Sequence, residues 1–454
     1  MTEKNDLMEK IVSLCKRRGF VFQSSEIYGG TGSVYDFGPL GVEMKNAIKR
    51  AWWIRFVTTR SEIVGLDTAI IQHPKTWEAS GHLKSFTDPL VECKKCHNRY
   101  RQDHLMEGKY VGTLKAKEPN QCPFCGAKDF SGAKDFNLMF KTFIGPTEDT
   151  ASVAYFRPET AQGIFLNFKS VLESSRVKIP FGIAQIGKAF RNEITPGNFI
   201  FRTREFEQME IEFFVKNSRE ESQKWYEYWV GETEKFYTDL GIKKENLSVR
   251  QHDEDELSHY SIGTSDIEYK FPFGTSELGG IAQRTDFDLK QHEQFSGRDL
   301  KYFDEVSGER YLPYVIEPSL GTDRAMLAFL VDGYKESDGT DGRESGEVVL
   351  ALHPSIAPVQ IAVFPLVKKD KLPEIAKRIS NELVSYHVRA FYDESGSIGR
   401  RYRRQDEIGT PWCVTVDFES VEKGTVTIRD RDTLKQERVK IDEVKGYIFE
   451  KLRS

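Results

Sequence analysis

At 454 residues the chain is too long for one ordinary hydrophobic core, so two or three domains are expected. With 39% hydrophobic and 30% charged residues it has a globular composition, and its formal net charge of −5 excludes global basicity as a sign of nucleic-acid binding; any such surface must be a local patch. The first residues are polar and no run of about 18 apolar residues occurs, so we expect no membrane partner and a cytoplasmic location.

Two helical patterns open the chain. Apolar residues recur at helical spacing from Glu3 to Arg18, and Gly19 is a plausible stop. A second apolar stripe follows Pro39 and runs to Phe56. This second helix would be half-buried on its own domain or packed across a subunit interface, and periodicity does not decide between them.

Residues of about 80–140 have the polar, glycine-containing composition of an insertion and hold four of the six cysteines in two C-x-x-C pairs. In a reducing compartment this pattern favours a metal over disulfides. We predict a zinc-knuckle-like structural site in which one Zn²⁺ is bound by Cys93, Cys96, Cys122 and Cys125. Four free thiols are the alternative; a catalytic zinc is excluded because four thiolates leave no open position. We expect Cys15 and Cys413 to be packing residues.

The middle of the chain predicts an antiparallel sheet. Short alternating runs with turn signals lie at 180–214 and 257–289, which favours hairpins over βαβ units. Residues 218–246 predict a helix and 335–347 a polar loop.

From residue 355 onward, strand and helix patterns alternate. Strands are predicted at 358–366, 388–395, 412–418 and 424–430, with helices at 372–386, 397–409 and 441–452. The helix at 397–409 is basic, so it is either a solvated surface or a phosphate-binding patch. This pattern predicts a small α/β domain with a mixed sheet.

The stretch from Ala189 to Phe214 combines arginine, phenylalanine and glutamate in one predicted hairpin. Because side chains alternate along a strand, one face carries Arg202, Arg204, Phe206, Gln208, Glu210 and Glu212. The opposite, core-like face carries Phe201, Thr203, Met209, Ile211 and Phe213. Arg191 and Glu193 on the preceding strand can reach the polar face. A solvated face of an edge hairpin would need no function.

The arrangement nevertheless suits a nucleotide beside a cation. Two guanidiniums near a flat ring can clamp phosphates and stack a base, while glutamates further along can take an ammonium group. The chain has no Walker A sequence and no Rossmann fingerprint, so a glycine-rich loop would not hold the phosphates. In EPSLGTDRAMLAFL, Arg324 precedes an apolar helix and is either a second phosphate ligand or an ordinary capping arginine.

These residues resemble a known family. Arg191-x-Glu193 followed by Arg202-x-x-x-Phe206-x-x-x-Glu210 is similar to motif 2 of class II aminoacyl-tRNA synthetases, GTDR with its helix resembles motif 3, and the Pro39 helix resembles motif 1, which forms the dimer interface in that family. YGGTGSVYDFGPLG, RPETAQGIF and TSELGGIAQRTDFDL resemble the dimeric, eukaryote-like glycyl-tRNA synthetases, over essentially the whole chain.

The resemblance implies an α+β fold and a homodimer. The catalytic core, built on an antiparallel β-sheet with helices, would span residues 1–354, including the cysteine insertion, and an α/β anticodon-binding domain with a mixed sheet would span 355–454. The implied reaction joins glycine to ATP as glycyl-adenylate and then transfers the glycyl group to the 3′ end of tRNA(Gly). Such a displacement at phosphorus depends on positioning, arginine and Mg²⁺, so no nucleophilic side chain is expected.

The resemblance also implies site residues. The ATP site would comprise Arg191, Asn192, Glu193, Phe201, Arg202, Phe206, Glu277, Leu278, Gly321, Asp323 and Arg324. Within it Arg191 would hold the α-phosphate, Phe206 would stack on adenine, Arg202 and Arg324 would bind the outer phosphates, and Glu277 would position ATP and Mg²⁺; Arg191, Arg324 and Glu277 are the expected catalytic set. The glycine site would comprise Arg99, Glu159, Phe206, Gln208, Glu210, Glu317 and Ser319.

Two alternatives stand beside this interpretation. One is a non-catalytic, synthetase-like nucleic-acid-binding accessory subunit, which would have no reason to keep Arg191, Phe206 and Arg324 together. The other is a class II synthetase with a different amino-acid specificity.

Overall fold

The computed structural model describes residues 3–106, 108, 110–111, 114–115, 118–149, 152–194, 196–258 and 260–453. The chain begins with helix α1 (Glu3–Arg18), the small hairpin β1 (Val21–Gln23) and β2 (Tyr35–Phe37), and helix α2 (Pro39–Trp53). Pro39 occupies the first turn of α2, where its missing N–H costs no hydrogen bond. Both predicted helices are confirmed, and the second continues as a wider π-helical turn at Ile54–Thr58.

In the described part of the chain the largest sheet has seven strands, in the order β14-β15-β16-β19-β13-β12-β3. These strands are β3 (Ile63–Gly65), β12 (Phe181–Phe190), β13 (Glu205–Val215), β14 (Leu247–Gln251), β15 (Gly263–Phe271), β16 (Gly274–Thr285) and β19 (Tyr314–Gly321). Neighbouring strands are antiparallel except the short edge pair of β3 and β12, which confirms the expected fold class.

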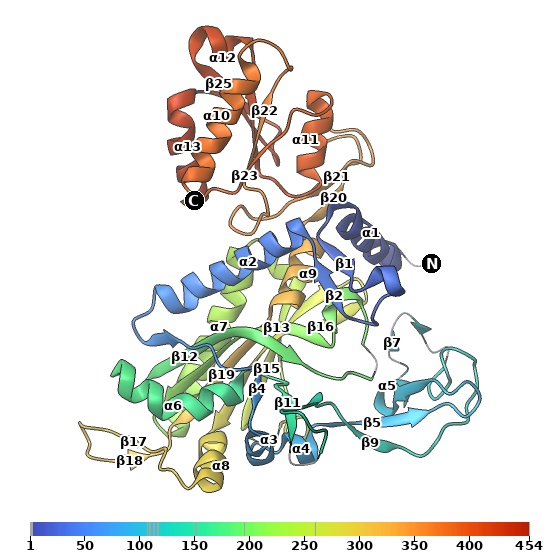
Figure 1. The fold of residues 1–454 in the computed structure, drawn as a ribbon, viewed down its shortest axis with the longest axis vertical. Helices are drawn as coiled ribbons and strands as arrows, with labels where there is room; N and C mark the ends of the chain where they lie inside the picture. The colour runs from blue at the N-terminus through green and yellow to red at the C-terminus, as the bar shows by residue number, and fades with distance from the viewer. Residues whose placement is uncertain are drawn as a thin grey trace.

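Helices cover both faces of this sheet (Figure 1). On one face α2, α7 (Arg219–Asp239) and α9 (Thr322–Gly333) pack on Met209, Ile211 and Phe213 of β13. On the other, α6 (Ala161–Ser175) and α8 (Phe287–Ser296) pack on Phe214. The alternation predicted for the hairpin therefore decides which core each β13 residue enters. Helix α7 ends at Asp239, so the prediction of a helix through residue 246 was wrong; a separate 3-10 turn occupies Lys244–Asn246.

The cysteine region forms a lobe beside the main sheet, drawn in cyan in Figure 1. Its strands β5 (Thr87–Glu92), β6 (Arg99–Arg101) and β9 (Lys134–Asn137) pair in the order β6-β5-β9. Around them lie α3 (Pro74–Ala79), α4 (His82–Ser85), α5 (Gln102–Met106), and the pair β7 (Tyr110–Val111) and β8 (Leu114–Lys115). A second small sheet, β10-β11-β4, joins this lobe to the core through β4 (Ile71–Gln72), β10 (Lys141–Phe143) and β11 (Val153–Phe156). Peripheral hairpins are β17 (Tyr302–Phe303) with β18 (Arg310–Tyr311), and β20 (Tyr334–Glu336) with β21 (Val348–Leu350).

Residues 361–453 build a separate mixed sheet in the order β23-β22-β24-β25-β26, with its own apolar core. Its strands are β22 (Ile361–Pro365), β23 (Ala390–Tyr392), β24 (Trp412–Val416), β25 (Thr425–Asp430) and β26 (Gln436–Lys440), and its helices are α10 (Leu372–Ser385), α11 (Ile398–Asp406), α12 (Phe418–Lys423) and α13 (Val444–Arg453). β22 is parallel to β23 and β24, whereas β25 and β26 are antiparallel, as a mixed sheet requires. Sequence patterns missed only the short α12 and the polar edge strand β26 among these elements.

The basic helix α11 does not present its arginines as one open patch. Arg401 is 2% exposed and donates to the carbonyl oxygens of Pro365 and Leu366. Arg403 pairs with Glu344 and Glu347, and Arg404 with Asp393. The burial of Arg401 contradicts both the solvated-surface and the phosphate-patch interpretation at that position; for the other arginines of α11 both stay predictions.

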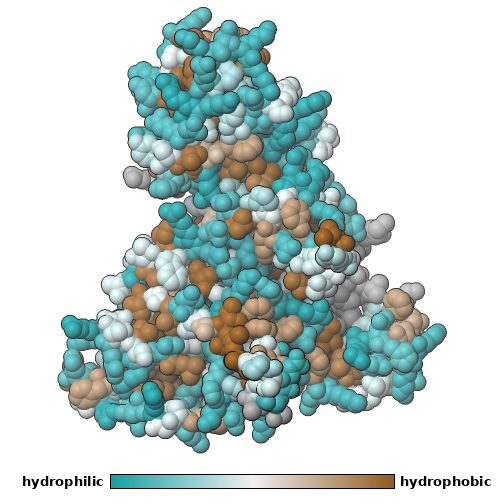
Figure 2. Space-filling view, in the orientation of Figure 1, coloured by the Kyte–Doolittle hydropathy of each residue, from teal (hydrophilic) through white to brown (hydrophobic). Residues whose placement is uncertain are grey.

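The C-terminal sheet lies beyond α1 and α2, above the main sheet in Figure 1. Glu407 ion-pairs with Arg17 and Arg18 of α1, and Arg431 donates to the carbonyl oxygens of Leu352 and Gly409. Among the described residues, none of the helices is long and apolar enough to cross a membrane. The face shown in Figure 2 is largely hydrophilic over the C-terminal region and carries more hydrophobic residues over the lower body.

Candidate active site

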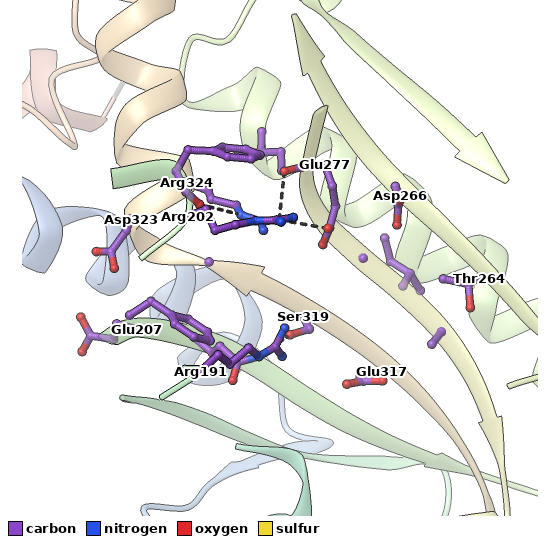
Figure 3. A pocket seen from close by; sticks show the side chains of 18 of the residues that line it. Arg191, Arg202, Glu207, Thr264, Asp266, Glu277, Glu317, Ser319, Asp323 and Arg324 are labelled. Carbon is purple, nitrogen blue, oxygen red and sulfur yellow. Dashed lines mark hydrogen bonds and ion pairs between the residues drawn. The ribbon is translucent and has the colours of Figure 1, made fainter. Parts of the chain in front are cut away.

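A cavity of about 370 Å³ opens on the α6/α8 face of the main sheet, between β13, β16, β19 and the loop that connects β12 to β13. In Figure 3, Arg202, Arg324 and Glu277 lie together, Glu317 lies apart from them, and Asp323 and Glu207 point away from the group. Many residues expected at the ATP and glycine sites line it: Arg191, Glu193, Phe201, Arg202, Phe206, Gln208, Glu277, Leu278, Glu317, Ser319, Gly321, Asp323 and Arg324. Residues at 191 and 324 are thus brought together although 133 positions separate them in the chain.

One end of the cavity is rich in guanidinium groups. Arg324, in the first turn of α9, ion-pairs with Glu277 over 3.0 Å and lies 4.6 Å from the centre of the Phe201 ring. Arg202 lies beside them (Figure 3). The two guanidiniums of Arg202 and Arg324 lie together there, and guanidinium groups match the oxygens of a chain of phosphates.

Arg191 lies between that end and the rest of the cavity. It follows the last residue of β12, and its Nε donates to the carbonyl oxygen of Pro158 over 3.0 Å. Its guanidinium is 5.3 Å from the centre of the Phe206 ring and 5.5 Å from that of Phe86. Held from two sides, Arg191 lies near a flat aromatic surface, and its Nη1 and Nη2 atoms make no hydrogen bond to the residues that the structure describes.

The strand that carries the motif begins later than predicted. Residues Phe199–Phe201 form a 3-10 turn, Gly197 bridges to Arg202, and β13 begins only at Glu205. The alternation therefore holds from Phe206 onward but not at Arg204. That side chain instead donates to the carbonyl oxygens of Gly32 and Glu193, so its predicted place on the polar face was wrong. A turn breaks strand periodicity, and parity cannot be counted across it.

The other end of the cavity has an acidic floor. Glu317 and Ser319 line this end, whereas Glu210 lies behind them and does not line the cavity. Glu210 is fully buried, pairs with Ser319 across β13 and β19, and accepts a hydrogen bond from the Thr160 hydroxyl. Gln208 Nε2 donates to Ser319 Oγ over 3.2 Å, which fixes the hydroxyl at the floor. Glu159 does not line the cavity itself but lies directly behind, 3.4 Å from His82 Nε2, and accepts from Gln162.

Arg284 and Asp288 belong to a buried network behind the acidic floor, and the sequence patterns did not single them out. Arg284 is 1% exposed, donates to Glu317 Oε2 over 2.9 Å, and makes two 2.9 Å hydrogen bonds to Asp288. The stretch TSELGGIAQRTDFDL contained both residues, but only the fold turns the end of β16 and the start of α8 toward Glu317. Other residues that no sequence pattern singled out also line the cavity: His252, Glu256, Ser258, Tyr260, Thr264 and Asp266.

The floor carboxyls titrate differently from one another. Burial raises the pKa of Glu317 to about 8, with Glu210 and Glu159 adding to the effect and Arg284 opposing it. Burial also raises the pKa of Glu210. For Glu159 burial acts in the same direction, but His82 and Arg284 outweigh it and hold the pKa well below its usual range. Such divergence in one cavity is typical of functional sites.

Besides Glu159 and Glu210, three further expected site residues lie elsewhere or act differently. Arg99 is 67% exposed in the cysteine lobe and pairs with Glu92, so the structure does not bring it to the cavity. Asn192 uses its backbone N–H to hold the loop to the carbonyl of Leu138 and does not line the cavity. Asp323 pairs with Lys45 of α2 over 2.6 Å and so ties α9 to that helix.

The four cysteines of the lobe converge. Cys93 Sγ is 3.6 Å from Cys125 Sγ, Cys96 Sγ is 3.6 Å from Cys122 Sγ, and all four sulfurs lie within 4.8 Å of one another. Tetrahedral Zn²⁺ with bonds of about 2.3 Å needs sulfurs about 3.8 Å apart, so the donor set fits this ion. Cys15 and Cys413 are buried in apolar cores, which confirms their prediction as packing residues.

Comparison with known proteins identifies the family. The tRNA synthetase class II core domain (G, H, P, S and T) matches residues 143–332, and an anticodon binding domain matches residues 360–451. The glycine–tRNA ligase of Caldanaerobacter subterraneus subsp. tengcongensis is 55% identical, with 98% of each chain covered. The chain belongs to the glycine–tRNA ligase family. The glycine–tRNA ligase of Geobacillus thermodenitrificans is 54% identical, with 100% of each chain covered.

Membership of the glycine–tRNA ligase family confirms the resemblance to class II synthetases and disfavours the other specificities considered. The relatives named here are bacterial, so the dimeric, eukaryote-like subtype stays a prediction. A prolyl-tRNA synthetase from Cryptosporidium parvum, solved as a crystal structure, shares the fold with a TM-score of 0.66 at 16% identity, covering 98% of this chain and 75% of that one.

Proposed function

We propose that this cavity forms glycyl-adenylate from glycine and ATP and that the chain transfers the glycyl group to the 3′ end of tRNA(Gly). The observation that carries the proposal is the division of one cavity into a guanidinium-rich end and a buried acidic floor. The first suits ATP phosphates, and the second suits the glycine ammonium group. The glycine carboxylate then falls between them, beside the α-phosphate.

The roles follow from the arrangement. Arg191 holds the α-phosphate and stabilises the charge that develops there, while Phe206 stacks on adenine. Arg202 and Arg324 bind the outer phosphates and the leaving pyrophosphate. Glu317 faces the ammonium, Glu210 and Glu159 add negative charge from behind the lining, and Ser319 with Gln208 closes the space that a methyl group would need.

Mg²⁺ bound with ATP would add further neutralisation of the phosphates. Glu277 fits a role in holding it, because this carboxylate engages Arg324 through Oε2 and is 46% exposed at the cavity. In-line displacement needs positioning more than covalent help, so no Ser, Cys or His nucleophile enters the mechanism.

The test is amino-acid-dependent exchange of pyrophosphate into ATP against a panel of amino acids, followed by charging of tRNA(Gly). Glycine is expected to support exchange, and alanine and serine far less. Exchange with another amino acid in preference to glycine, or none from a folded protein, would reject the proposal. The second outcome is what the non-catalytic accessory alternative expects.

The remaining assignments are part of the same proposal. Residues 1–354 form the catalytic core and residues 355–454 bind the anticodon, supported by the two family matches. One structural Zn²⁺ is held by the four lobe cysteines, supported by their sulfur separations. Their free thiols, outside any disulfide, agree with a cytoplasmic location.

The enzyme works as a homodimer of the eukaryote-like type. Supporting this, α2 is the helix that resembles motif 1 and has apolar side chains at its surface. Val42 on α2 is 42% exposed, and Ile54 in the π-helical turn that continues α2 is 44% exposed. Sedimentation equilibrium measures the assembly state, and a monomer at micromolar concentration would reject this part.

A further inference from the structure

Glu212 is a buried carboxyl group that the proposed mechanism does not use. It lies on β13 two residues after Glu210 and therefore on the same face of the strand. Glu210 pairs with Ser319 and Phe213 with Ile316, so the register sets Glu212 opposite Glu317 on β19. Its side chain is 0% exposed.

Unlike its neighbours, Glu212 has no hydrogen-bond donor. Neither of its carboxylate oxygens has a partner among the described residues. Glu317 accepts from Arg284, and Glu210 accepts from Thr160. An oxygen of Glu212 nevertheless lies within 4.8 Å of oxygens of both Glu210 and Glu317.

The charges around the acidic floor show that its carboxyl groups cannot all be ionised. Among the described residues, three cationic groups face these carboxyls: Arg284, which Asp288 and Glu317 already engage, the buried Arg157, whose charge acts on Glu210, and His82, which lies 3.4 Å from Glu159. With glycine bound, its ammonium adds one positive charge, whereas full ionisation would place a negative charge on each of Glu159, Glu210, Glu212, Glu317 and Asp288. Like charges directly opposite in a sheet repel, and burial of an unpaired carboxylate is strongly unfavourable. At least one proton must therefore remain on these groups.

We infer that Glu212 is a positioning residue for glycine: it stays a neutral carboxylic acid and donates its O–H to Glu317, which fixes that carboxylate beneath the ammonium. This inference rests on the proposed function of the cavity. Glu212 suits the role because a protonated carboxyl is the form that supplies a donor, and Glu317 is the acceptor directly across the ladder.

The surroundings favour the neutral form. Burial, and then the charge of Glu317, raise the pKa of Glu212 well above its ordinary value, and Arg284 only partly opposes them. A neutral acid also leaves the floor attractive to one ammonium group without the repulsion of a further charge. The arrangement thus supplies an aimed hydrogen bond where an ionised carboxylate would push Glu317 away.

Two substitutions separate this role from simple space filling. Glu212→Leu keeps a similar volume and removes the donor, whereas Glu212→Gln keeps a neutral group with N–H donors. In pyrophosphate exchange, we expect the glycine KM to rise about 10-fold or more in Glu212→Leu, with the ATP KM within about 2-fold of wild type. Glu212→Gln should restore the glycine KM to within about 3-fold, with an unchanged pH profile.

An infrared measurement reads the proton directly and needs no activity. In the difference spectrum between wild type and Glu212→Gln, recorded above pH 8 where the Glu317 carboxyl is ionised, the carbonyl stretch of one buried carboxylic acid should appear. A Glu212→Gln variant as impaired for glycine as Glu212→Leu, or absence of that carbonyl band, would overturn the inference by showing that the ionised form is required. Wild-type glycine binding by Glu212→Leu would overturn it as well.

The same experiments separate this inference from the proposed function. Failure of the wild-type protein to exchange pyrophosphate with glycine would reject the function of the cavity. The infrared band would still decide whether Glu212 holds the proton. Normal wild-type exchange together with a failed rescue by glutamine would reject the role of Glu212 alone.

Discussion

Arg284 Nη1 donates to Glu317 Oε2 over 2.9 Å with both side chains buried, so one guanidinium supports the acidic floor from behind. The same arginine donates two further hydrogen bonds to Asp288. The floor is thus a network in which each carboxyl depends on a neighbour, and removal of the cation leaves the others unpaired.

Loss of Arg284 should destabilise the fold. Arg284→Met leaves buried carboxylates without their counter-ion, and breaking a buried pair in this way costs about 3 to 5 kcal/mol. Urea unfolding of the purified variants measures the free energy. Arg310→Ala is the matched control, since Arg310 is 57% exposed and its pair with Asp299 should contribute about 1 kcal/mol at most. Equal losses in the two variants would contradict the buried network.

Arg191→Ala should remove adenylate formation. Without the guanidinium near Phe206 the α-phosphate loses its main charge stabilisation, and the exchange rate should fall by at least about 100-fold. Pyrophosphate exchange at saturating glycine and ATP measures this, with Arg310→Ala as the exposed-arginine control. Substantial exchange by a folded Arg191→Ala protein would end the α-phosphate assignment.

Glycine binding should depend on pH through Glu317. Because the pKa of this carboxyl is raised to about 8, it is largely protonated at lower pH in the free protein and attracts an ammonium group less. The glycine KM should therefore fall as pH rises toward about 8, by at most about 10-fold per pH unit for a single proton. The ATP KM measured in the same titration is the internal control, and Glu317→Gln should flatten the dependence.

The ionisation of Glu317 has the opposite effect on folding stability, which should fall as pH rises. Without glycine, the folded state binds the Glu317 proton more tightly than the unfolded chain, whose carboxyl has a pKa of about 4.3. This group therefore weakens the fold progressively as pH rises from about 4.3 to about 8.

For glycine binding, a glycine KM that rises with pH across the same range would contradict the role of Glu317.

Ser319 should contribute to the exclusion of alanine. It pairs with Glu210 in the sheet and accepts from Gln208, which holds its hydroxyl at the end of the cavity where we propose that glycine binds. Overpacking costs about 1 to 3 kcal/mol, which corresponds to about 5- to 150-fold discrimination, and Ser319→Ala should lose part of it. The ratio of kcat/KM for glycine and alanine measures the effect, with the exposed Ser248→Ala as control. An unchanged ratio would remove Ser319 from the account of specificity.

Zinc removal should affect the cysteine lobe. About one Zn²⁺ per chain is expected by elemental analysis, and Cys93→Ser should lower that content because a tetrahedral site loses one thiolate. Limited proteolysis should then cut first within residues 87–137. Cys15→Ser, which changes a buried cysteine outside the cluster, is the control for metal content. Full zinc retention by Cys93→Ser would exclude this cysteine as a ligand.

Local patterns predicted much of the site because strand alternation is a short-range property. Phe206, Gln208 and Glu210 share a face in β13 for a purely geometric reason, and the core side of the same strand was predicted with them. The motif spacing placed Arg191 and Arg324 in one ATP site through family resemblance, and the cavity brings them together. The paired cysteine spacing predicted convergence, which the sulfur distances confirm.

The sequence by itself determined the α+β class, the family and the residues that periodicity can order along one strand. Only the tertiary structure decided which charges are paired. Arg204 left the polar face because a turn interrupted the strand, and Arg401 became buried because carbonyl groups of another segment satisfied it. Arg284 and Glu212 became part of the acidic floor because strand register, which depends on contacts between distant segments, brought them beside Glu317. The sequence identifies which residues carry a charge, whereas the energy of each charge depends on its burial and on the partner that the fold supplies.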